Sequence, residues 1–197
     1  MAAAQKPDRS LNGDHGGEGG DGRNLWAIEP MPAELIDSPL DFIFAEHHRQ
    51  REATDIIMMI ADGGFDKGGV TALVAFLERD FAFHIGDEEV VLFPVLKEHC
   101  LPEDNVDRVI ARLEEEHRED ETIADQAISI LKSRLSGQLI KPFEAGRLRM
   151  FAEHIRQHLA LENGVLLPIA RVRLEANELR LLAEMLKDRR RSLPDSK

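Results

Sequence analysis

The segment His84–Val95 reads HIGDEEVVLFPV, and its pattern returns 74 residues later in His158–Ile169, which reads HLALENGVLLPI. His, Glu, Val, Leu and Pro stand at the same offsets in both segments. A second pair, Glu46-His47 and Glu116-His117, recurs at an offset of 70 residues. We interpret the chain as a duplicated pair of helices. Two such halves can pack with pseudo-two-fold symmetry, which would bring both copies of the motif to one place.

The spacing of apolar residues is helical from Ser38 onward, where Ser38-Pro39 combines a favourable N-cap residue with a proline in the first turn. Gly63-Gly64 and Gly137 are expected to end helices. Pro94 should kink its helix or start an early last turn, and Pro168 lies inside a later helix. The pattern predicts an all-α, up-down-up-down four-helix bundle with helices near 38–62, 69–98, 103–136 and 142–171, and an extra C-terminal helix near 175–190 outside it.

Three parts of the chain are expected on this basis. Residues 1–30 form a disordered or extended N-terminal segment, since residues 11–22 hold six glycines and one large apolar residue. Trp26, Ile28 and Met31 are expected to dock as an extended arm. Residues 38–172 form the bundle, and residues 173–197 the C-terminal helix and tail.

Composition excludes several classes of function. The 197 residues carry 25 basic and 37 acidic side chains, and the net charge of −12 argues against nucleic-acid and anionic-membrane partners. Cys100 is the single cysteine, which excludes an internal disulfide and thiolate clusters, and the absence of tyrosine excludes phenol chemistry. We expect a cytoplasmic protein, because neither a signal peptide nor a membrane-spanning run is evident.

Histidines and glutamates interrupt the apolar stripes of the four expected helices. His84 and Glu88 continue the stripe of the second helix, and His158 and Glu162 that of the fourth. One stripe histidine lies on each remaining helix, namely His47 on the first and His117 on the third. The neighbouring His48 lies on a more polar stripe, so His47 is taken as the inward residue. Burying four imidazoles and two carboxylates without partners would be severely unfavourable.

Metal ions would compensate this burial. Residues at i and i+4 stand one above the other on a helix, so each HxxxE pair can present one nitrogen and one carboxylate to the same region. Four imidazoles and two carboxylates suit two divalent first-row metals, with two histidines on each and both carboxylates bridging; iron, manganese and zinc all accept such ligands. A single HxxxE is weak support, because His48/Glu52 and His117/Glu121 have the same spacing. A lone inward histidine is more often hydrogen-bonded within a core.

These residues resemble the hemerythrin-like, or HHE cation-binding, family. Its order of His, HxxxE, His and HxxxE on successive helices matches His47, His84/Glu88, His117 and His158/Glu162, and the run Glu88–Pro94 is also typical. The resemblance covers about Pro39–Arg171. It implies a non-haem di-iron centre with two carboxylate bridges, to which an oxo or hydroxo bridge can be added; zinc and manganese are the less expected metals.

One difference bears on the role. Oxygen-carrying hemerythrins have HxxxH on the third helix, where this chain has His117 and Glu121. The set is more similar to bacterial HHE proteins, including those linked to repair of iron centres after nitrosative stress, whose N-terminal cysteine-bearing segment the glycine-rich tail lacks. Glu121 and His154 remain candidates for an extra ligand or for a group that contacts the ligands.

Three functions stay open. The first is binding or sensing of dioxygen, peroxide or nitric oxide. The second is a di-iron enzyme that processes peroxide or nitric oxide or repairs iron centres, and the third is iron storage or iron sensing. The expected partner is therefore a small diatomic or peroxide ligand; a homodimer through the C-terminal helix is compatible with the sequence.

Overall fold

The computed structural model describes residues 24–192, so the predicted disorder of the glycine-rich tail concerns residues outside this range. Within it the chain is all-helical, as expected, without a strand. The α-helices follow one another as α1 (Pro39–Ala61), α2 (Lys67–Ala75), α3 (Ala82–Asp87), α4 (Phe93–His99), α5 (Val106–Leu135), α6 (Pro142–Leu161), α7 (Leu167–Arg173) and α8 (Ala176–Arg191). Turns of 3₁₀ helix lie at Ala33–Asp37 and Pro102–Asp104.

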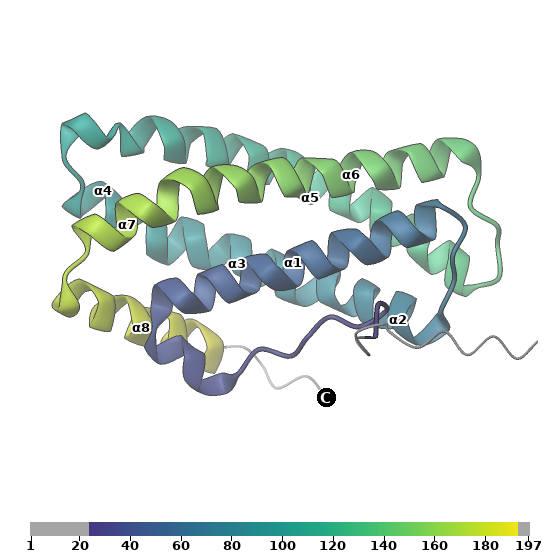
Figure 1. Cartoon of the computed structure of the whole chain (residues 1–197), viewed down its shortest axis with the longest axis horizontal. Coiled ribbons are helices and arrows are strands. Elements are labelled where there is room, and N and C mark those ends of the chain that lie inside the picture. The colour runs from purple at the N-terminus through teal and green to yellow at the C-terminus, as the bar shows by residue number, and fades with distance from the viewer. Residues whose placement is uncertain (1–23, 193–197) are drawn as a thin grey trace, which may run out of the picture.

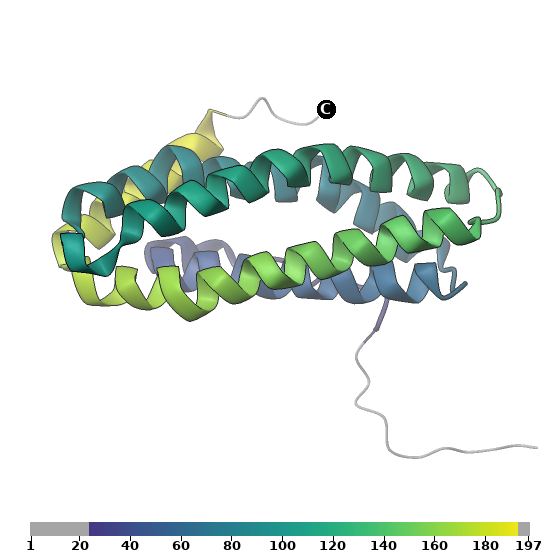
Figure 2. The same ribbon diagram turned by 90° about the horizontal axis from the view of Figure 1, so that it is seen from above.

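Several of these helices are parts of longer continuous rods. π-Helical turns at Phe76–Phe81 and Glu88–Leu92 join α2, α3 and α4, and a π turn at Glu162–Leu166 joins α6 to α7. Figures 1 and 2 show α1, the joined helices α2–α4, α5 and the joined helices α6–α7 lying side by side along the long axis, with α8 packed at one end against α1. We call these, in chain order, the first, second, third and fourth rods. The rods α1 and α6–α7 share the most extensive contact, followed by α5 with α6.

Two of these π turns lie just before the prolines, Glu88–Leu92 before Pro94 and Glu162–Leu166 before Pro168. Proline has no N–H to donate and its ring crowds the carbonyl four residues earlier, so a regular α ladder is not possible there. The N–H of Phe93, just before Pro94, reaches back five residues to the carbonyl of Glu88. The N–H of Leu167 does the same to Glu162, just before Pro168. Glu88 and Glu162, the glutamates of the two repeated HxxxE motifs, therefore each begin a π turn.

The helix ends agree with the sequence in part. Gly63 and Gly137 adopt φ values of 95° and 90°, the left-handed conformation that ends helices after α1 and α5. Ser38 precedes α1 as expected, but its side chain makes no capping hydrogen bond. The second helix, expected to start near Gly69, begins at Lys67, because Asp66 caps α2 by accepting the Gly69 N–H at 2.7 Å.

The hydrophobic core is divided by a polar layer. One apolar cluster joins the second half of α1 to α2, the second half of α5 and most of α6. The other joins the start of α1 to α4, the start of α5, α7 and α8. Trp26 and Ile28 pack on the first cluster and Met31 on the second, which confirms the docked arm. The buried histidines and glutamates lie between the two clusters along the rods.

Candidate metal centre

The structure brings all six sequence-predicted residues together in the polar layer. His47 comes from α1, His84 and Glu88 from the second rod, His117 from α5, and His158 and Glu162 from the fourth rod, and each is at most 4% exposed. Their ligand atoms form two overlapping groups in which all atoms lie within 4.8 Å of one another. One group contains His47 and His84, the other His117 and His158, and both contain Glu88 and Glu162.

The two glutamates stand between the two histidine pairs. Glu88 Oε1 lies 3.5 Å from His47 Nε2, and Glu88 Oε2 lies 3.5 Å from His84 Nε2 and 3.4 Å from His117 Nε2. Glu162 Oε2 lies 3.4 Å from His47 Nε2, while its Oε1 lies 3.1 Å from His158 Nε2. Each carboxylate thus reaches histidines of both pairs, which is the arrangement required of a group that bridges two metal ions.

Every one of the four imidazoles has an outer partner at Nδ1. His84 and His158 donate to Glu46 and Glu116 at 3.0 Å, and His47 and His117 donate to Asn163 and Glu89 at 2.9 Å. The partners follow the repeat, since Glu46 corresponds to Glu116 and Glu89 to Asn163. Donation from Nδ1 fixes the orientation of the ring and leaves the Nε2 lone pair of a neutral imidazole directed at the centre.

Buried atoms without hydrogen-bond partners mark the middle of this layer. Among residues 24–192, none is found for His47 Nε2, His84 Nε2, or the four carboxylate oxygens of Glu88 and Glu162. Leaving such groups unsatisfied is costly, and native proteins rarely do so without an ion, a water or a function. Nitrogen and oxygen donors in this number fit two first-row divalent ions. The donor set therefore passes the chemical test for a dinuclear metal site.

The carboxylates of the polar layer favour the protonated form of the buried histidines. Burial by itself would lower the pKa of His84, but the Glu88 carboxylate and the hydrogen bond with Glu46 raise it to about 9. Burial opposes protonation of His158 in the same way, and Glu162 raises its pKa to about 10. Burial would raise the pKa of Glu88, but the surrounding imidazoles hold it well below its usual value. The raised pKa values of the two histidines mean that this layer favours positive charge.

Comparison with known proteins agrees with this geometry. A family model described as the hemerythrin HHE cation binding domain matches residues 38–170. The chain belongs to this family. The iron-sulfur cluster repair protein YtfE of Escherichia coli O157:H7 is similar to it, with 26% identity over 158 residues that cover 74% of this chain and 68% of the relative. The match to the family model ends at residue 170, before α8 begins at Ala176.

Two predicted extra candidates lie outside both groups. Glu121 is exposed and lines a surface groove with Phe81 and Ile85. His154 points its Nδ1 to within 3.5 Å of Asp120 Oδ1 and is 22% exposed. The HxxxE spacing of His117 and Glu121 therefore does not bring Glu121 to the centre.

The HxxxE pair His48/Glu52 also lies outside the two groups. His48 is 58% exposed and faces Glu52 on the same helix. The selection of His47 over His48 as the inward residue is confirmed by burial.

Sequence reasoning missed the contribution of α8. Asp87 is fully buried beside Glu88, and Arg189 and Arg190 of α8 bind its two oxygens at 2.8 and 2.6 Å. Arg190 also lies 3.5 Å from Glu46, the outer partner of His84. The sequence suggested only that the arginines complement the dipole of their helix. Hydrophobic periodicity holds no signal for this pairing across about a hundred residues.

A glycine makes room for this contact. A Cβ on Gly86 would come within 2.3 Å of Arg189 Nη2, so the helix is open at this point for the guanidinium. A helix outside the family match thus places two positively charged side chains next to the His84/Glu88 motif.

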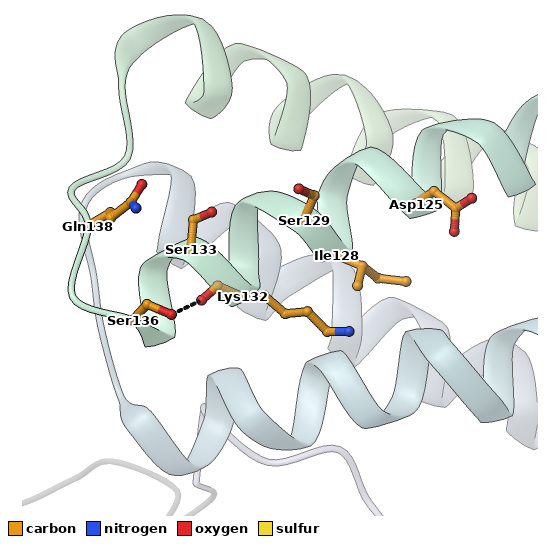
Figure 3. A pocket seen from close by; sticks show the side chains of 7 residues that line it. All are labelled: Asp125, Ile128, Ser129, Lys132, Ser133, Ser136 and Gln138. Atoms are coloured by element: carbon orange, nitrogen blue, oxygen red, sulfur yellow. Dashed lines mark hydrogen bonds between the residues drawn. The ribbon is translucent and has the colours of Figure 1, made fainter.

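A surface pocket elsewhere carries no comparable chemistry. About 450 Å³ in volume, it is formed by the last turns of α5 and the loop after it, where Ser136 Oγ donates to the Lys132 carbonyl at 3.1 Å (Figure 3). None of the six residues lines it. Among the described helices, none has the length and apolar character needed to span a membrane.

Proposed function

We propose that this chain is a non-haem di-iron protein that binds or senses dioxygen, peroxide or nitric oxide. The ligands would be His47 and His84 on one iron and His117 and His158 on the other, with Glu88 and Glu162 shared, on an up-down-up-down bundle. The observation that carries the proposal is the pair of overlapping four-residue groups that share both glutamates. Family membership supports metal binding in general, and the nitrogen and oxygen donor set is compatible with iron.

The protein's own side chains would orient the ligands, supply negative charge and exclude bulk water. The outer partners hold four imidazoles with Nε2 inward, and two carboxylates supply two negative charges to offset the two cations. The apolar clusters above and below keep bulk water away, and Phe93 stacks on His117 with ring centres 5.8 Å apart. Bound iron would supply reversible coordination of small ligands and exchange of electrons.

The test is metal analysis and visible spectroscopy of the aerobically purified full chain, followed by exposure of the reduced iron form to nitric oxide. We expect two iron ions per chain and a spectral change that reverses when the gas is removed. Zinc in place of iron, or an iron form whose spectrum ignores oxygen, peroxide and nitric oxide, would contradict the proposal. Catalytic consumption of peroxide or nitric oxide would instead assign an enzyme.

A second candidate is repair of iron centres, favoured by the similarity to a protein named for iron-sulfur cluster repair. In this case the chain would release iron to a damaged acceptor. Incubation of the iron-loaded chain with an apo iron-sulfur protein, inorganic sulfide and a thiol separates the two candidates. Faster cluster formation than with the same concentration of free Fe²⁺ would favour repair, and equal or slower formation would favour ligand binding alone.

A further inference from the structure

The two halves of the centre differ in one systematic way. At two pairs of repeat-related positions, the half with His117 and His158 has a carboxyl group where the half with His47 and His84 has an amide. The first pair is Glu89, which accepts from His117, and Asn163, which accepts from His47, both at 2.9 Å.

The second pair lies one helical turn beyond the same two histidines. Asp120 follows His117 by three residues, and Gln50 follows His47 by three. Both side chains are only 2% exposed, so the difference between acid and amide is kept inside the protein. Gln50 is one methylene longer than Asp120, and the two side chains differ in charge and in hydrogen-bonding capacity.

The outer partners of His84 and His158 do not cancel this difference. Glu46 and Glu116 occupy the same role in the two halves, and each has one arginine nearby. Arg190 lies 3.5 Å from Glu46, and Arg112 binds Glu116 at 2.7 Å. His84 and His158 therefore have similar outer partners, and the inequality concentrates on His47 and His117.

We infer that the two metal positions are unequal, with the ion at His117 and His158 held more tightly and the ion at His47 and His84 exchangeable. This inference rests on the proposed di-iron function. A carboxylate that accepts the Nδ1–H makes the imidazole a more basic, more electron-donating ligand, whereas an amide does so less. Negative charge beside a cation also stabilises it directly. The exchangeable position is then the half that α8 contacts through Arg190 and Glu46.

The experiment is an anaerobic Fe²⁺ titration of the full chain against a chromogenic chelator. We expect two classes of affinity, separated by about 10- to 100-fold, the range found when such outer partners are removed. His47→Ala should abolish the weaker class and His117→Ala the tighter one. Glu89→Gln should lower the Fe²⁺ affinity of the tighter class, and Asn163→Asp should raise that of the weaker class. Each variant should therefore bring the two dissociation constants closer together.

Glu115→Gln is the matched control for net charge. Glu115 lies on α5 two residues before His117, is 64% exposed and pairs with Arg118 rather than with a histidine. It should leave both affinities unchanged. Two equal classes in the wild-type chain, or an equal effect of Glu89→Gln and Glu115→Gln, would overturn the inference while leaving the proposed function intact. A chain that binds no Fe²⁺ would overturn both.

Discussion

Replacing Glu88 by Gln should weaken both metal positions at once, although it changes a single side chain. The reason is geometric, since the two oxygens of Glu88 lie 3.4–3.5 Å from histidines of both pairs. Glutamine has nearly the same shape but supplies no negative charge and only one oxygen. Iron content should fall from two per chain to less than one.

The size of the effect follows from linkage. A metal present at 100 times its dissociation constant stabilises the folded state by about 2.7 kcal/mol, so two ions contribute about 5 kcal/mol. In a chain of this length each kcal/mol corresponds to about 2–4 °C in Tm, which gives a metal-induced shift of about 10–20 °C for the wild type. Glu88→Gln should lose more than half of this shift.

Thermal unfolding followed by circular dichroism, with and without metal, measures the shift. Comparing the two states of the same variant removes any effect of the substitution on the metal-free fold. Glu52→Gln is the control, because Glu52 belongs to the exposed HxxxE pair with His48. The reasoning would be refuted if Glu88→Gln kept one metal at wild-type affinity, or if Glu52→Gln lost as much of the shift.

Three further outcomes are expected. Arg189→Ala combined with Arg190→Ala leaves the buried carboxylate of Asp87 unpaired, which should lower the free energy of unfolding by about 3–5 kcal/mol in chemical denaturation. The control is Arg191→Ala, which should change this free energy very little because the Arg191 side chain is 67% exposed. Equal losses in the two variants would contradict the role of α8. Because the pKa of His84 is raised to about 9, its protonated form stabilises the metal-free fold fully below its ordinary pKa of 6.5, and this stability should fall as pH rises through 9. Metal affinity should change in the other direction and fall as pH decreases. Calorimetry at several pH values measures both trends, and a metal-free stability that rises with pH through 9 would contradict the reasoning. Glu121→Gln should retain two metals in elemental analysis, and loss of one would show that Glu121 is a ligand.

The sequence predicts the middle of this molecule well because the repeat and the helical period act together there. Four helices with His47, His84, His117 and His158 on their apolar stripes can meet only in the core. Burial then requires partners, which restricts the interpretation to a metal or a polar network. The sequence left Glu121 and His154 open as extra ligands or outer contacts, and only the structure shows that neither belongs to the two four-residue groups.

Other features depend on contacts that one-dimensional patterns do not contain. The pairing of Asp87 with α8 joins residues about a hundred positions apart, and a run of arginines at a helix end has a simpler local explanation. The sequence predicts a kink or an early last turn at Pro94 but no π turn, because the way in which a helix accommodates a proline depends on the rods packed around it. Glu46 and Glu116 were visible as a repeat, but their role requires the position of the opposite histidine.

The central claim is that six side chains from two related halves hold two metal ions. The most direct measurement is X-ray diffraction from crystals of the iron-loaded full chain, recorded on both sides of the iron absorption edge. We expect two anomalous peaks between Glu88 and Glu162, one beside His47 and His84 and the other beside His117 and His158. A single peak, a peak elsewhere, or ordered water in place of iron would contradict the claim.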